Sequence, residues 1–145
     1  METRLTEEKK LESKRDISRL MSFFVSEHGS ESLEEVLLHL AKKESVVFEN
    51  TGIYFAGDLD EWDDPHKIVD EYHVILFGCK PAMKEDCIVF LDFQELYDYM
   101  SEALYEYIEY THKVVKERPD FPPSFALNKE GILKSLEKLK EELEL

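Results

Sequence analysis

The chain has 145 residues, of which 43% are apolar and 12% aromatic, and its formal net charge at pH 7 is -15. This size and composition are typical of one globular domain, expected over residues 1–145, and they exclude a disordered acidic tail. Residues 1–19 are charged throughout and no run approaches the roughly 18 apolar residues of a membrane span, so we expect a cytoplasmic protein.

Two helices are predicted in the N-terminal part. The first covers residues 6–27, although the mainly charged residues 1–15 are expected to fray. Its apolar residues recur at helical spacing: Ile17, Leu20, Met21 and Phe24. The second covers residues 33–43, because Ser32 and Glu35 match a capping box that precedes an apolar stripe.

Four short strands are predicted next. They cover residues 45–49, 52–56, 72–78 and 87–91, which are rich in β-branched and aromatic side chains. Strands that follow one another this closely favour a mainly antiparallel meander. Four apolar side chains are expected on the face under the helices: Val74, Leu76, Ile88 and Phe90.

The longest predicted helix begins after Asp92, which can cap it, and ends before Pro119. Its apolar stripe runs over about six helical turns. A Pro-rich connector, residues 119–127, leads to a terminal helix that Asn128 can cap. That helix carries a narrow apolar seam, Ile132, Leu136, Leu139 and Leu143, which can dock on the domain or join two copies in a homodimer.

The predicted fold class is therefore α+β. It has an antiparallel sheet of about four strands packed against a long helix, with two N-terminal helices and one C-terminal helix.

The negative charge is concentrated in the middle of the chain. Residues 44–112 hold 17 Asp and Glu against 3 Lys and Arg, whereas residues 1–43 and 113–145 are each close to neutral. Charge gathered in this way repels itself and weakens the compact state, so we expect it to serve a basic protein partner. The same charge disfavours nucleic acid and anionic membranes as partners.

The densest acidic segment lies between the second and third predicted strands. Its candidate binding residues are Asp58, Asp60, Glu61, Trp62, Asp63 and Asp64, followed by Asp70 and Glu71. Three interpretations stay open: a solvated loop, a calcium loop and a protein-docking loop. A calcium loop starting at Asp58 fails at its fifth, sixth and twelfth positions. Trp62, the only Trp, favours docking because Trp often anchors interfaces, unless its indole fills the core.

A second acidic feature lies on the predicted long helix. Asp98, Glu102, Glu106 and Glu109 follow the spacing i, i+4, i+8 and i+11, which places their carboxylates on one outer ridge. Tyr99, Tyr105 and Tyr110 border that ridge. Such a ridge is either a solvated helix face or a contact surface, and tyrosines beside carboxylates favour contact.

The sequence gives little support for catalytic activity or for a bound cofactor or metal. The sequence contains no phosphate-binding Gly-rich loop, nucleophile elbow or zinc-protease motif, so we expect no enzyme, cofactor or metal. The five histidines are scattered: His28, His39, His66, His73 and His112. Cys79 and Cys87 are expected to be reduced thiols, because cytosolic proteins rarely keep disulfides.

Two segments resemble a known family. They are residues 53–55 and the run Asp86-Cys87-Ile88-Val89-Phe90-Leu91-Asp92-Phe93-Gln94-Glu95-Leu96-Tyr97-Asp98-Tyr99-Met100, in which a strand continues directly into a Tyr-rich helix. Over about residues 46–112 the chain resembles immunity proteins of contact-dependent growth inhibition that neutralise secreted ribonuclease toxins.

This resemblance implies an acidic antitoxin that blocks a basic nuclease toxin without chemistry of its own. The loop carboxylates would pair with toxin Lys and Arg, with Trp62 as anchor. The long helix would supply a second line of contacts: Asp98, Glu102, Tyr105 and Glu106. The alternative is a structural or regulatory interaction module, homodimeric through the terminal seam.

Overall fold

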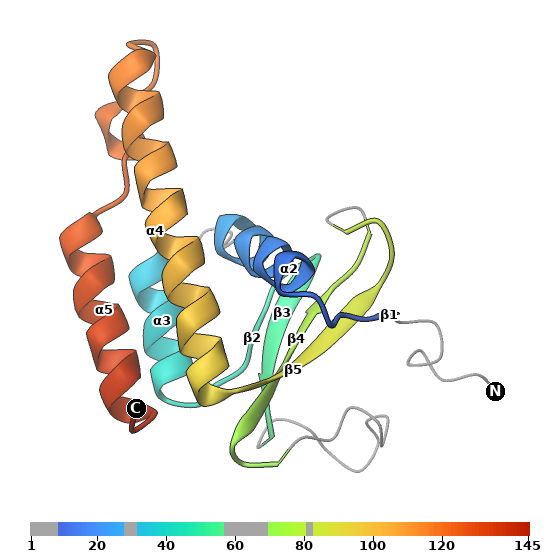
Figure 1. The fold of residues 1–145 in the computed structure, drawn as a ribbon. Coiled ribbons are helices and arrows are strands. Elements are labelled where there is room, and N and C mark those ends of the chain that lie inside the picture. The colour runs from blue at the N-terminus through green and yellow to red at the C-terminus, as the bar shows by residue number, and fades with distance from the viewer. Residues whose placement is uncertain (1–8, 28–31, 57–69, 81–82) are drawn as a thin grey trace.

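The computed structural model of the chain describes residues 9–27, 32–56, 70–80 and 83–145. In chain order the elements are β1 (Lys9–Lys10), α2 (Lys14–Glu27), α3 (Leu33–Ala41), β2 (Val46–Val47), β3 (Thr51–Phe55), β4 (His73–Gly78), β5 (Cys87–Asp92), α4 (Phe93–Glu117), the 3-10 helix η3 (Pro123–Phe125) and α5 (Lys129–Glu142). Figure 1 shows their arrangement.

The strands form one sheet in the order β1-β5-β4-β3-β2. β2, β3, β4 and β5 pair antiparallel with their neighbours, whereas β1 adds a fifth, parallel strand beside β5. The predicted α+β class is thus confirmed, with the antiparallel meander, the long helix, two N-terminal helices and one C-terminal helix.

The first helix is shorter than predicted. α2 begins at Lys14 and not at residue 6, and Lys9–Lys10 form β1 instead. The charged residues before Lys14 have no apolar stripe that a helix could pack against the core. Leu11 is buried there, and its backbone N–H donates to the Ile88 carbonyl oxygen at 2.9 Å, which ties the segment to the sheet.

The two faces of the sheet are both apolar. Val74 and Leu76 lie in the main core with the helices, as predicted, but the prediction that Ile88 and Phe90 share this face is wrong. Side chains alternate along a strand, so the odd-numbered residues of β5 face the helices and the even-numbered ones face away. The opposite face consists of strand residues and Ala56: Tyr54, Ala56, Ile75, Phe77, Ile88 and Phe90.

The apolar seam of α5 is buried inside the chain. Ile132, Leu136, Leu139 and Leu143 are at most 5% exposed, and α5 packs along α3. The terminal helix therefore docks on its own domain. The seam is thus covered within the chain, and the homodimer through it stays an untested prediction.

α4 follows β5 without a linker. Asp92 ends β5 and also caps α4: its carboxylate accepts from the Glu95 N–H at 2.8 Å, while the Glu95 carboxylate accepts from the Asp92 N–H at 3.1 Å. This capping box satisfies backbone donors at the start of the helix. The predicted start of the helix at Asp92 and its end before Pro119 are confirmed.

α4 extends past the start of α5, and the connector folds back along it (Figure 1). The Leu127 N–H donates to the Thr111 hydroxyl at 3.2 Å, and His112 Nε2 lies 2.8 Å from the Leu127 carbonyl oxygen. The rings of Phe121 and Phe125 pack with centroids 5.0 Å apart. Contacts with the connector thus hold the C-terminal end of α4 in place.

Glu27 joins the end of α2 to the β2–β3 turn. Its carboxylate accepts from the Asn50 N–H at 3.0 Å, the Asn50 amide at 2.8 Å and the Thr51 hydroxyl at 2.6 Å. A carboxylate at the last residue of a helix meets the negative end of the helix dipole. The three hydrogen bonds therefore explain why an acid occupies this position.

We expect Glu27→Ala to destabilise the protein by about 2–3 kcal/mol, because the buried Thr51 hydroxyl and the Asn50 donors lose a charged acceptor. The free energy of unfolding from urea denaturation measures this loss. Ser22→Ala, on the exposed side of α2, is the control and should change stability by less than about 0.5 kcal/mol. Equal effects of the two variants would contradict the role assigned to Glu27.

Candidate functional site

The predicted binding residues divide into two groups. Asp58, Asp60, Glu61, Trp62, Asp63 and Asp64 lie outside the described residues. The others are all described and all exposed: Asp70, Glu71, Asp98, Glu102, Tyr105 and Glu106.

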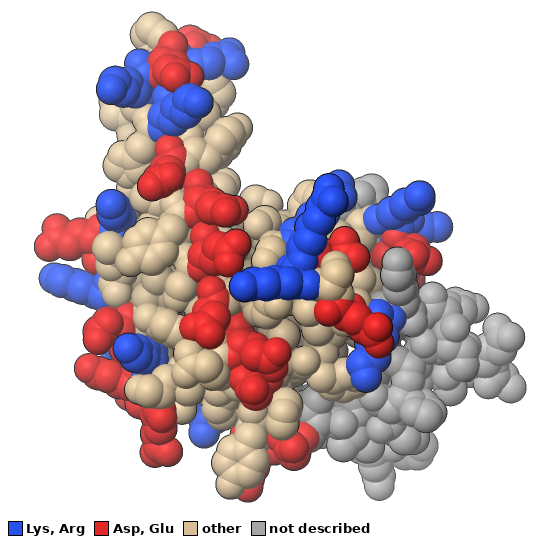
Figure 2. All heavy atoms as spheres, viewed as in Figure 1, with Lys and Arg blue, Asp and Glu red and all other residues tan. Residues whose placement is uncertain are grey.

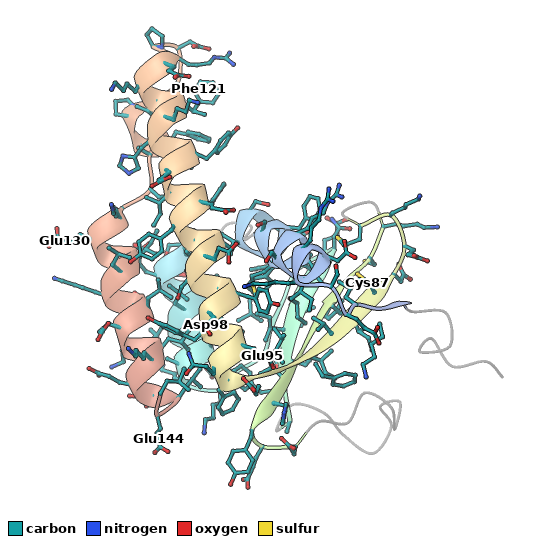
Figure 3. All side chains as sticks on the ribbon, in the orientation of Figure 1. Cys87, Glu95, Asp98, Phe121, Glu130 and Glu144 are labelled. Atoms are coloured by element: carbon teal, nitrogen blue, oxygen red, sulfur yellow. The ribbon has the colours of Figure 1, made fainter. Side chains whose placement is uncertain are left out.

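Four carboxylates form a line along the outer side of α4, which we call the α4 ridge: Asp98, Glu102, Glu106 and Glu109. The inward side of the same helix carries the buried residues Leu96, Met100, Leu104 and Ile108, so burying that stripe turns the ridge to solvent. Figure 2 shows the acidic column along α4, and Figure 3 labels Glu95 and Asp98 near its lower end.

The ridge has no counter-ion within the described part of the chain. Asp98 accepts from the Gln94 side-chain amide at 3.0 Å, and no described Lys or Arg lies within ion-pair distance of the four carboxylates. Basic side chains do lie over α2, beside the acidic column in Figure 2. The exposed basic residues of α2 are Lys14, Arg15 and Arg19. The acidic surface is therefore a narrow strip that follows one helix.

Tyrosines flank the ridge on both sides. Tyr105 and Tyr110 are 48% and 56% exposed, and the Tyr110 ring stacks on Tyr107 with centroids 6.3 Å apart. Burial, and then the negative charges of Glu95 and Glu102, raise the pKa of Tyr99. Rings that are half exposed beside solvated carboxylates offer a partner both contact area and hydrogen bonds.

The strand register brings a second pair of acids to the foot of α4. His73 of β4 lies opposite Asp92, the cap of α4, so the turn at Asp70 and Glu71 lies at the same end of the sheet as the ridge. Residue spacing alone did not reveal this proximity.

The Asp70 turn is held by a backbone hydrogen bond from the His73 N–H to the Asp70 carbonyl oxygen at 3.3 Å and by two contacts of the Asp70 carboxylate. The Asp70 carboxylate lies 2.7 Å from His73 Nδ1 and accepts from the Tyr72 N–H at 2.8 Å. The hydrogen bond from His73, followed by that from Tyr72, lowers the pKa of Asp70. A hydrogen bond to the Glu71 carboxylate raises the pKa of Tyr72.

Tyr72 is the exposed residue that the sequence analysis missed. Its side chain is 64% exposed beside Asp70 and Glu71, although it was assigned to a strand. β4 begins one residue later, at His73. The apolar run from Val74 to Phe77 could not distinguish a first strand residue from the turn before it.

The described residues contain no metal-ligand cluster and no membrane-spanning helix. No group of three or more His, Cys, Asp or Glu side chains there could hold a metal ion, and neither Cys79 nor Cys87 forms a disulfide. None of the helices in the described ranges is long and apolar enough to span a bilayer.

The placement of Glu102 beside Tyr99 can be tested by titration. Glu102→Gln should lower the pKa of Tyr99 part of the way toward its ordinary value, because one of the two negative charges is removed while burial, the larger cause, remains. NMR of ring-labelled tyrosine measures the shift. Glu109→Gln removes the same charge farther along the ridge and should leave Tyr99 unchanged. An unchanged Tyr99 pKa in Glu102→Gln would show that the two side chains do not face each other.

A comparison with protein families matches residues 16–118 to a family model described as CDI immunity protein, where CDI denotes contact-dependent growth inhibition. The match includes α2 from Asp16 onward, α3, β2 to β5 and α4, and thus the whole ridge. No curated protein and no solved structure gives a significant match. Since the family match covers well over half of the chain, the chain belongs to the CDI immunity protein family.

Proposed function

We propose that the protein neutralises a basic nuclease toxin by covering the surface with which the toxin holds nucleic acid. The α4 ridge would be the centre of this contact, with Asp70, Glu71 and Tyr105 at its edges. The acidic segment from Asp58 to Asp64 would contribute further carboxylates. Membership of the CDI immunity protein family indicates that the partner is a toxin. The charge of the ridge supports a basic one.

The observation that carries this proposal is the uncompensated charge of the ridge. Carboxylates with structural roles are paired or hydrogen-bonded, as Glu27 and Asp92 are. Of the four ridge carboxylates, only Asp98 has a described hydrogen bond, and its donor is a neutral amide. Aligned charges that form no ion pair within the described chain are available to an external cation.

A nuclease supplies the complementary surface. Lys and Arg side chains neutralise the phosphates of a nucleic acid and provide most of its non-specific affinity. An acidic helix placed on those side chains covers the cationic surface that the nucleic acid needs for binding. Substrate entry is therefore blocked. No bond is made or broken, so the protein acts as a non-catalytic inhibitor. It would act in the cytoplasm, where it meets an incoming toxin.

Electrostatics would also set the rate of capture. Complementary charge raises association rates to about 10⁸–10⁹ M⁻¹s⁻¹ at low salt, and this gain falls steeply as ionic strength rises. A protein that must intercept a toxin before it cleaves nucleic acid benefits from fast capture.

The direct test measures binding to, and protection against, the cognate CDI toxin domain. We expect Glu102→Gln with Glu106→Gln to weaken binding about 10- to 100-fold, which corresponds to about 1.4–2.8 kcal/mol. The matched control is Glu137→Gln with Glu141→Gln on the exposed side of α5. This control removes the same charge away from the ridge, so its affinity should stay near that of the wild type.

Calorimetry and a nuclease assay at physiological salt provide the readouts. Equal affinities of the ridge and α5 variants would remove the ridge from the mechanism and leave only net charge. The Asp58–Asp64 carboxylates are tested separately by changing them to Asn or Gln. Unchanged affinity there would exclude that segment.

A further inference from the structure

The outer face of α4 has no partner among the described elements. α4 has 25 residues, about 37 Å at a rise of about 1.5 Å per residue, and its inward stripe alone is packed against the core. The outward strip lies open to solvent along the acidic column in Figure 2. A helix presented lengthwise in this way suits a groove better than a flat surface.

The spacing of the ridge charges indicates what kind of groove. Asp98 to Glu109 spans about 16 Å of helix axis, which is one carboxylate per roughly 5 Å. Duplex DNA carries one charge per about 1.7 Å of axis, and each of its strands one per about 3.4 Å. The ridge thus has about two thirds of the charge density of one strand and only a third of that of a duplex. Its charge spacing is closer to that of one strand than to that of a duplex.

The tyrosines beside the ridge resemble a second feature of a single strand, its exposed bases. Grooves for single-stranded nucleic acid combine basic side chains along the backbone with aromatic side chains on which bases stack. Tyr105 and Tyr110 present half-exposed rings on the two sides of the ridge. These rings offer π-faces to such aromatic platforms while the carboxylates meet the basic side chains.

The acidic ridge ends at Glu109. Exposed Lys113 and Lys116 follow on the same helix, Glu117 offsets one of these charges, and Arg118 is paired with Asp120 at 3.5 Å. A basic groove therefore attracts the segment from Glu95 to Glu109 and not the part of α4 that follows it. This limits the contact to about 21 Å of helix.

From this geometry we propose that α4 lies lengthwise in the toxin's substrate groove, in the place of single-stranded nucleic acid, with the ridge carboxylates on the phosphate sites and Tyr105 and Tyr110 on the base-stacking sites. This inference rests on the proposed function and specifies its mode. The partner surface is a basic groove specific for single strands. We choose it because the charge density of the ridge and its exposed rings together resemble a single-stranded nucleic acid.

The test is a competition experiment with the cognate CDI toxin domain and fluorescent, uncleavable oligonucleotides: a single-stranded RNA, a single-stranded DNA and a DNA duplex. Wild-type protein should displace a bound strand stoichiometrically, measured by anisotropy. Glu102→Gln with Glu106→Gln, and separately Tyr105→Ala with Tyr110→Ala, should each require at least about 10-fold more protein. The α5 control, Glu137→Gln with Glu141→Gln, should compete like the wild type. Circular dichroism verifies that the exposed substitutions leave the fold intact.

The outcomes separate this inference from the proposed function. A ternary complex, in which neutralised toxin keeps its strand, overturns groove entry but leaves neutralisation standing. Competition with duplexes alone overturns the assignment to single strands. Failure of the wild-type protein to bind or protect against the toxin domain overturns the proposed function, and the inference with it.

Discussion

The junction at Asp92 determines where the described candidate contact residues lie. One residue closes β5 and caps α4 through a reciprocal hydrogen-bond pair, so no linker separates sheet and helix. The direction of α4 is therefore fixed by the sheet, and its rotation is fixed by the burial of Leu96, Met100 and Leu104. Because β4 pairs with β5 in register, the Asp70 turn is brought to the same end.

Stability and charge are supplied by different parts of the molecule. The main core joins residues from α2, α3, α4, α5 and one sheet face, while Glu27 ties α2 to the β2–β3 turn. The ridge carboxylates stay hydrated, so their mutual repulsion is screened and costs little of the free energy of folding. A surface that is poorly compensated in the free protein is tolerated because the apolar interior is continuous beneath it.

Local signals predicted much of this fold, and long-range pairing accounts for what they missed. The caps at Ser32, Asp92 and Asn128 were readable because each lies within three residues of the backbone it satisfies. β1 was missed because its partner is β5, nearly eighty residues away. The assignment of Ile88 and Phe90 failed because both faces of the sheet are apolar, which removes the alternation that marks a buried side. The ridge was readable from helical spacing, whereas its proximity to Asp70 depends on strand register.

The division of α4 into buried and solvated positions separates folding from partner choice. Substitutions at outward positions such as Glu102, Tyr105 and Glu106 touch no core contact, whereas neighbours such as Leu104 allow little change. Such a helix can exchange its recognition residues one at a time while the scaffold persists. A lineage facing altered toxins could thus acquire new specificity by drift along a single exposed stripe, without passing through unstable intermediates.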